Sequence, residues 1–207
     1  TGEWTYTLAN ATAAVQALAA GESHTETFTI RVTDDKGASA DQTVTVTVSG
    51  TNDAPVVTNA AADAAGAVTE DTTLVAAGQL AASDVDHGAT QAWSVQSPAA
   101  GAYGAIAVDA STGKWTYALA NATAAVQALA AGETKNETFS IRVTDDKGAY
   151  ADQTVKVTVS GTNDGPVITS GAQGALVSEI ADLATGENSA THVRNGTIAY
   201  SDIDTID

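Results

Sequence analysis

The sequence predicts an all-β protein built from tandem Greek-key β-sandwich repeats, with one short helix in each repeat. Residues 1–56 recur as residues 112–167 at a constant offset of 111, with nine differences. That period is too long for a solenoid repeat and matches one sandwich domain. Within each period, short runs of alternating apolar and polar residues are separated by turn residues, which is the pattern of strands that bury one face.

The repeat is out of phase with the ends of the chain. We expect residues 1–55 to be the C-terminal part of one repeat, residues 56–166 to be a complete repeat, and residues 167–207 to be the N-terminal part of the next. The chain has no initial Met and begins within an expected strand, so we expect it to be a segment of a longer array.

Seven short strands are expected in the complete repeat. They cover residues 56–58, 78–82, 91–96, 104–108, 114–119, 139–143 and 155–159. The fourth and fifth form a hairpin around a turn. Trp115, Tyr117 and Leu119 share one face by their spacing of two, so we expect them in the core. Trp4 and Trp93 are also expected to be core residues.

One segment departs from the strand pattern. Residues 121–132 are rich in Ala, and Val126 and Leu129 lie three positions apart. This pattern predicts a short helix that crosses between the sheets, capped by Asn121 and ended by Gly132.

The chain is strongly acidic, with 25 Asp and Glu against 8 Lys and Arg and a formal net charge of −17. Such a charge repels nucleic acid and anionic membranes and favours cations as partners. No apolar run approaches the roughly 18 residues of a membrane span, and no segment resembles a signal peptide. Because the chain has no Cys, an exported form would need another stiffening device, such as a metal.

Five acidic features recur in each period at the ends of expected strands. With their counterparts in the next repeat in parentheses, they are Glu22 (Glu133), Asp34 (Asp145), Asn52 and Asp53 (Asn163 and Asp164), Glu70 (Glu179), and Asp84 and Asp86 (Asp202 and Asp204). If the chain runs from pole to pole of each sandwich, all five meet at the junction between repeats. Crowded carboxylates repel one another unless a cation compensates them, and carboxylate and carbonyl oxygens are the ligands of calcium. The sequence therefore predicts Ca²⁺ sites at the junctions.

Each feature also has a plainer explanation. Asp34 precedes a Lys-Gly pair and is a favoured hairpin-turn residue, and Asn52 and Asp53 would suit a simple turn before Pro55. A transition metal is not expected, because the three His fall at non-equivalent positions of the repeat. No Ser-His-Asp set recurs and the chain has no Cys nucleophile, so we expect no enzymatic activity.

The segments WTYTLAN, LAAGE, FTIRVTDDKG and VTVSGTNDAPV, within residues 4–56 and with few changes within 115–167, resemble the VCBS repeat of large RTX-type bacterial adhesins. The complete repeat is also similar to the cadherin-like (bacterial Ig-like) sandwich. That resemblance implies interdomain calcium held by an early Glu, a DxD pair, an acid before a strand, an Asp ahead of a Gly turn, and Asn-Asp before Pro. The chain departs from the cadherin linker at Gly50 and Gly161, where that linker has Asp, so fewer or weaker ions are implied.

The resemblance implies a calcium-stiffened spacer (extender) segment of a bacterial cell-surface or secreted adhesin, which supports cell adhesion or biofilm formation. It also implies type I secretion into calcium-rich extracellular surroundings. The alternative is a carbohydrate- or protein-binding β-sandwich module that contributes affinity directly. The expected partners are neighbouring repeats of the same chain, with head-to-tail self-association through the unfinished ends, and neither nucleic acid nor membrane insertion is expected.

Overall fold

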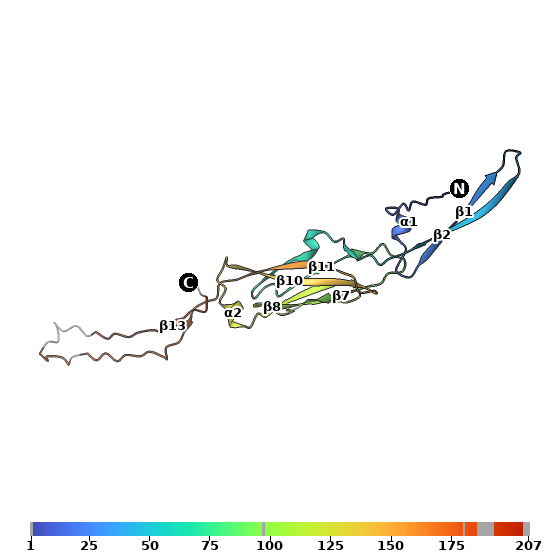
Figure 1. The fold of residues 1–207 in the computed structure, drawn as a ribbon. Coiled ribbons are helices and arrows are strands. Elements are labelled where there is room, and N and C mark those ends of the chain that lie inside the picture. Colours follow the sequence, from blue (N-terminus) through green and yellow to red (C-terminus); the bar gives the residue numbers. More distant parts are fainter. Residues whose placement is uncertain (1, 97, 180, 186–192, 205–207) are drawn as a thin grey trace.

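The computed structural model describes residues 2–96, 98–179, 181–185 and 193–204. Three parts follow one another along one long axis (Figure 1): a two-stranded hairpin with a short helix, a β-sandwich, and an extended C-terminal segment with a small strand pair. Among the described residues, no helix has both the length and the apolar character to cross a membrane.

Strands dominate the chain. The first part contains α1 (Ala13–Gln16), β1 (Ser23–Thr33) and β2 (Ser39–Ser49). The sandwich contains β3 (Val56–Val57), the 3₁₀ turn η1 (Ala61–Ala64), β4 (Ala65–Thr69), β5 (Val75–Gln79), β6 (Ala82–Ser83), β7 (Gln91–Val95), β8 (Gly104–Val108), β9 (Lys114–Leu119), α2 (Ala124–Gln127), β10 (Thr134–Asp145) and β11 (Tyr150–Ser160). The last part contains β12 (Val167–Ile168) and β13 (Tyr200–Ser201).

Two main sheets form the sandwich. One has the strand order β4-β11-β10-β7 and the other the order β5-β9-β8, while β3 and β6 form a separate pair. β4 lies parallel to β11, with Val68 beside Val159, and the other neighbours are antiparallel. Early strands therefore flank the late β10–β11 hairpin, as Greek-key connections require. The predicted all-β sandwich is confirmed.

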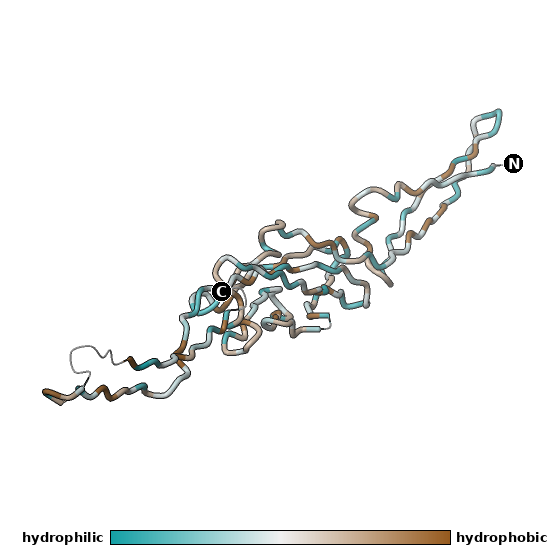
Figure 2. Tube along the Cα trace, turned by 90° about the vertical axis from the view of Figure 1, so that its left-hand side faces the viewer, coloured by the Kyte–Doolittle hydropathy of each residue, from teal (hydrophilic) through white to brown (hydrophobic). Residues whose placement is uncertain are grey.

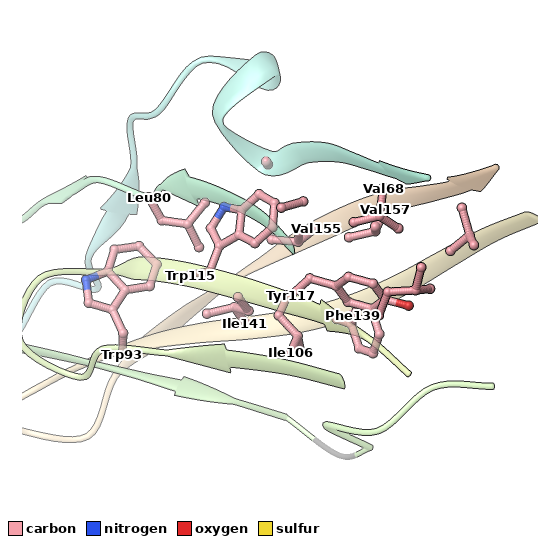
Figure 3. Packing of buried hydrophobic residues seen from close by; sticks show 14 of the residues in the cluster. Val68, Leu80, Trp93, Ile106, Trp115, Tyr117, Phe139, Ile141, Val155 and Val157 are labelled. Carbon is pink, nitrogen blue, oxygen red and sulfur yellow. The ribbon is translucent and has the colours of Figure 1, made fainter. Parts of the chain in front are cut away.

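The core lies between these sheets (Figure 3). Trp115 and Tyr117 on β9 are fully buried, and they belong to one apolar cluster with Trp93, Ile141 and Val157. The alternation of β9 predicted its buried face correctly, because successive strand residues point to opposite sides of a sheet. Burying one such large side chain contributes about 1.5–3 kcal/mol.

The β1–β2 hairpin has nearly the same sequence as β10–β11, but in the described chain no second sheet packs against it. The registers agree, since Phe28 pairs with Val44 as Phe139 pairs with Val155. Phe28 is 43% exposed, however, whereas Phe139 is 4% exposed. Figure 2 shows hydrophobic stretches alternating with hydrophilic ones along this hairpin.

The expectation that Trp4 is a core residue was wrong, because its side chain is 53% exposed. The counterpart of Trp4 in the complete repeat is Trp115, which packs against residues that precede it, including Gly66 and Gly78. The described part of the first repeat begins at residue 2, so these packing partners have no equivalent there.

The helix is shorter than predicted. α2 has four residues, its N-cap is Thr123, and no side-chain hydrogen bond caps it. Asn121, the predicted cap, instead donates from Nδ2 to Asp71 Oδ1 (2.6 Å) and accepts from the Asp71 N–H (3.0 Å). Gly132 follows the helix with a φ of 84°, a left-handed conformation that suits Gly.

Strand β4 was not predicted. Its sequence, Ala-Gly-Ala-Val-Thr, includes two Ala and one Gly, which are poor strand formers. It becomes a strand because it pairs in parallel with the full length of residues Lys156–Ser160 on β11. This pairing is a tertiary effect that overrides local propensity.

Candidate metal centres at the two joints

We call the segment Gly50–Pro55 with its contacts joint 1, and the segment Gly161–Pro166 with its contacts joint 2. At joint 1, Asn52 donates from Nδ2 to Asp145 Oδ2 (2.9 Å), and the Asp53 N–H donates to Asp86 Oδ2 (2.8 Å). The linker is therefore hydrogen-bonded to two separate loops of the following sandwich.

Glu22 belongs to the first part of the chain and makes contacts at joint 1. Its Oε2 accepts from the Ala19 N–H (3.1 Å) and lies 3.2 Å from His87 Nδ1. The His87 N–H also donates to the Ala17 carbonyl (3.0 Å), so the loop after Asp86 is bonded to both parts. A cavity of about 230 Å³ opens here, lined by polar residues of both parts that include Glu22, Asp86 and Asp146.

Joint 2 repeats the backbone geometry of joint 1. The Asp164 N–H donates to Asp204 Oδ2 (3.0 Å), and the Asp204 N–H donates to Asp202 Oδ1 (3.1 Å). At joint 1, the Asp86 N–H likewise donates to Asp84 Oδ1 (3.0 Å). In each DxD pair the first carboxylate thus braces the loop, and the second reaches across to the linker.

Glu70 lies at joint 2 and is fully buried. Its Oε2 accepts from the Thr162 N–H of the linker (3.2 Å), and its Oε1 accepts from Gln127 Nε2 (2.8 Å). The strand pairing places it there, because β4 runs parallel to β11 and ends beside Ser160, directly before the linker.

Among the residues that the structure describes, five buried carboxylate oxygens at the two joints have no hydrogen-bond partner. They are Asp84 Oδ2 and Asp86 Oδ1 at joint 1, and Glu133 Oε2, Asp164 Oδ2 and Asp204 Oδ1 at joint 2. Asp86 and Asp204 are only 8% and 6% exposed. A buried carboxylate oxygen without a partner is costly, and a cation would remove that cost. The donor set is oxygen only, so these residues fit a hard divalent cation such as Ca²⁺.

The electrostatics agree with this fit. Burial, together with the negative charges of Asp164, Asp71 and Asp204, raises the pKa of the Glu70 carboxyl. Burial, followed by the charges of Asp204, Asp71 and Asp202, likewise raises the pKa of Asp164. Mutual repulsion at joint 2 is therefore only partly relieved by the protein itself.

Asp145 at joint 1 is better compensated. Burial alone would raise the pKa of its carboxyl, but hydrogen bonds from Asn52 and from the Lys147, Ala149 and Gly148 N–H groups lower it overall. Next to it, Lys147 Nζ lies 2.7 Å from Asp146 Oδ2 and holds the pKa of the Asp146 carboxyl below its usual range.

The expectation that all five acidic features of a period meet at one junction was wrong. Asp145 lies at joint 1, before its own sandwich, whereas Glu70 lies at joint 2, after it. The hairpin geometry explains this division, because β10 has 12 residues and its two ends lie roughly 40 Å apart. The acid that ends β10 therefore belongs to the joint at the other end of the sandwich.

Two predicted ligands lie away from both joints. Asp34 is at the exposed tip of the β1–β2 hairpin, where Oδ1 accepts from the Lys36 and Ala38 N–H groups. Glu179, the counterpart of Glu70, is exposed in the extended C-terminal segment. Asn163 joins no second loop in its described contacts, and its Nδ2 donates to the Asp164 carbonyl (2.8 Å).

Within the part of the chain that the structure describes, no three side chains of His, Cys, Asp or Glu gather tightly enough to hold a metal ion by themselves. Carbonyl groups of the linker, or Asn52, would have to complete a coordination shell, as in calcium sites with mixed oxygen ligands.

Asp71 is a joint residue that the repeat pattern does not reveal, because Ile180 stands at its place in the next repeat. Its φ of 55° is unusual for a residue with a side chain, and Asn121 holds it through two hydrogen bonds. Its charge contributes to the raised pKa values of Glu70 and Asp164. Only the contact with Asn121, 50 positions away in sequence, reveals this role.

Comparison with known proteins gives a family. A family model described as a bacterial cadherin-like domain matches residues 52–161, more than half of the chain. No curated protein matches the sequence significantly.

The solved structures to which the chain is similar include cadherin ectodomains. Protocadherin gamma B7 extracellular domains 1–4 has a TM-score of 0.49 at 19% identity, covering 89% of this chain and 42% of that one. Drosophila N-cadherin EC1-4 has a TM-score of 0.44 at 14% identity, covering 70% and 35%. The chain thus spans less than half the length of these structures. On the strength of the family model, the chain belongs to the bacterial cadherin-like domain family.

Proposed function

We propose that this chain is a calcium-stiffened spacer of a bacterial cell-surface or secreted adhesin, in which the sandwich repeats hold a distal binding module away from the cell. The single observation that carries the proposal is the set of buried carboxylate oxygens without a hydrogen-bond partner in the described part of the chain, which lie on the following repeat at joint 1 and on both sides of joint 2. Membership of the cadherin-like family supports it, because cadherin-like domains generally bind Ca²⁺ and serve adhesion or extension rather than catalysis.

In this proposal the repeat boundaries lie after residues 55 and 166, so each joint links two repeats. Glu22, Asn52 and Asp53 contribute oxygens from the first repeat at joint 1, and Asp84, Asp86 and Asp145 contribute them from the second. At joint 2 the corresponding groups are Glu70, Glu133, Asn163 and Asp164 on one side, and Asp202 and Asp204 on the other.

Bound Ca²⁺ would supply the positive charge that these oxygens lack. Without it, carboxylates from adjacent repeats repel each other, and the linker is held only by hydrogen bonds such as the one between the Asp53 N–H and Asp86. With both sides ligated, the angle between repeats is constrained, and a flexible string of domains becomes a rod. Secretion into calcium-rich surroundings, by a type I route, would delay this stiffening until after export.

Small-angle X-ray scattering with calcium and with a chelator tests the proposal. We expect the maximum dimension to be longer and better defined with calcium, because the joints no longer bend. The double variant Asp84→Asn, Asp86→Asn should lose part of this effect, while Asp34→Asn, far from both joints, should keep it. A maximum dimension that does not respond to calcium in the unmodified chain would sink the proposal.

A second function remains the direct binding of carbohydrate or protein by a sandwich face. The apolar face of β1–β2, lined by Trp4, Tyr6 and Phe28 among others, favours it. In the complete repeat the equivalent positions Trp115, Tyr117 and Phe139 are core, so the spacer is the better supported proposal.

The partner that we propose for this uncovered hairpin is a second copy of the chain, joined head to tail. In the complete repeat, Val68 of β4 lies beside Val159 of β11. Val177 stands in the place of Val68, and Val48 in the place of Val159. A strand around Val177 from one copy would therefore lie along β2 of another in the same register. Val177 is 51% exposed and available for this pairing.

A further inference from the structure

Glu133, which joint 2 would offer to calcium, already holds a cation from its own strand. Lys135 Nζ lies 2.7 Å from Glu133 Oε1, and the two side chains are 41% and 19% exposed. Lys135 pairs across the hairpin with Val159, which is fully buried. Since directly opposed residues share a face of the sheet, the Lys135 stem lies on the inward face and its ammonium reaches the joint end.

The second oxygen of the same carboxylate, Oε2, is in a different situation. Glu133 Oε2 is buried and has no hydrogen-bond partner among the described residues. The Glu133 carbonyl accepts from the Gly161 N–H of the linker (3.0 Å), so this residue is attached directly to joint 2. One carboxylate oxygen thus lacks a partner, and the other is paired with an ammonium.

The first repeat has no Lys beside the corresponding Glu. His24 occupies the position of Lys135. There, Glu22 accepts from the Ala19 N–H and lies beside His87 from the next repeat, in place of a Lys on its own strand. The linker contact is the same, because the Gly50 N–H donates to the Glu22 carbonyl (2.9 Å). The two repeats therefore form a matched pair that differs in the charge beside the Glu.

We propose that Lys135 is a competing cation built into joint 2, which raises the calcium concentration that this joint needs in order to close. The proposal rests on calcium binding at the joints, as argued above. The ammonium occupies one of the lone-pair sites of Glu133 Oε1, and as long as it stays nearby it repels a divalent ion. In the absence of calcium, the same ion pair partly neutralises the acidic end of the sandwich.

Like an ordinary Lys side chain, Lys135 carries a positive charge throughout the neutral range. Its ammonium therefore competes with a metal ion for Glu133 wherever adhesion would take place. A neutral side chain of similar length should remove this competition without removing the stem that covers the core.

Calcium titration followed by NMR tests this in the full chain. The amide signals of Gly161 and Gly50 report on joints 2 and 1, since each N–H binds the carbonyl of the Glu concerned. For Lys135→Gln, we expect the Gly161 midpoint to fall by about three- to tenfold, which is the size expected from removing one partly screened charge. The Gly50 midpoint should not change.

Two further variants control for charge and position. Lys135→Arg keeps the charge and should leave the Gly161 midpoint within about twofold of the original. His24→Lys introduces the same competitor beside Glu22 and should raise the Gly50 midpoint while Gly161 stays constant. Metal-free spectra that retain the dispersed signals of the sandwich establish that each variant is folded.

The possible outcomes distinguish a failure of this proposal from a failure of calcium binding at the joints. If Gly161 responds to calcium but its midpoint is the same or higher in Lys135→Gln, Lys135 is not a competitor, and the calcium joint stands. If neither Gly161 nor Gly50 responds to calcium at any concentration, both proposals fail.

Discussion

At the scale of single residues, Gly50 and Gly161 allow the linker to pack closely against the backbone of the repeat that precedes it. A Cβ at Gly161 would collide with the carbonyl groups of Leu129 and Ala130, and one at Gly50 would collide with those of Leu18 and Ala19. The cadherin linker has an Asp at this position, so the sequence alone suggests that Gly50 and Gly161 each remove one calcium ligand. The packing gives the stronger reason, because any side chain here would push the turn before Glu133 away.

The first prediction concerns this contact. Gly161→Ala should lower the free energy of unfolding by about 1–3 kcal/mol, because an inserted methyl group in a close-packed site forces the backbone to shift. Urea unfolding followed by tryptophan fluorescence measures it, since Trp93 and Trp115 are buried in the sandwich.

Gly165→Ala is the matched control, because a Cβ there has open space and the first repeat already has Ala54 at that place. It should change the free energy of unfolding by less than about 0.5 kcal/mol. Equal losses in the two variants would contradict the steric explanation.

At the scale of elements, one hairpin sequence has two environments in the same chain. β10–β11 is flanked by β4 and β7 in its own sheet and shares a core with the β5-β9-β8 sheet, whereas β1–β2 has the same register and a largely exposed apolar face. The alternating pattern and the cross-strand pairs therefore suffice to form the hairpin, and the second sheet is needed to bury it.

The second prediction uses this internal comparison. Ile141 is fully buried and its counterpart Ile30 is 41% exposed. Ile141→Ala should lower the free energy of unfolding by about 2–5 kcal/mol, which includes the cost of the cavity that remains. Ile30→Ala should cost about 1 kcal/mol or less. Thermal unfolding followed by circular dichroism compares the two, and similar midpoints would show that Ile141 is not the core residue described here.

At the scale of the whole molecule, the parts are strung along one axis and meet at two acidic joints (Figure 1). The net charge of −17 is spread along this length, so repulsion favours extension and opposes association. Head-to-tail pairing would have to overcome that repulsion with the apolar face of β1–β2.

The third prediction concerns this pairing. Light scattering coupled to size-exclusion chromatography, at two protein concentrations, should show a mass that rises with concentration and rises further in salt, which screens the repulsion. Val177→Asp should reduce the rise, because a charge would be buried beside Val48. An unchanging monomer mass at both concentrations and both salt levels would exclude the partner.

Much of the architecture could be predicted because it depends on local patterns. The alternation of Trp115, Tyr117 and Leu119 predicted a buried face, and the hairpin of β8 and β9 lies where its turn residues place it. The recurring acidic features predicted that joint 1 and joint 2 would be alike, and their matching Asp–Asp hydrogen bonds agree. β4 and the role of Asp71 escaped prediction, since both depend on partners far away in sequence.

The sequence by itself determined the alternating strands of the core, the periodic acidic linker and the oxygen-only character of the candidate ligands, because these follow from residue type and short spacing. Only the tertiary structure decided which acids share a joint. Asp145 and Glu70 lie at opposite ends of one sandwich, since a loop's pole depends on the direction of the strand before it. It also decided which oxygens lack partners and which one, on Glu133, already has a cation beside it.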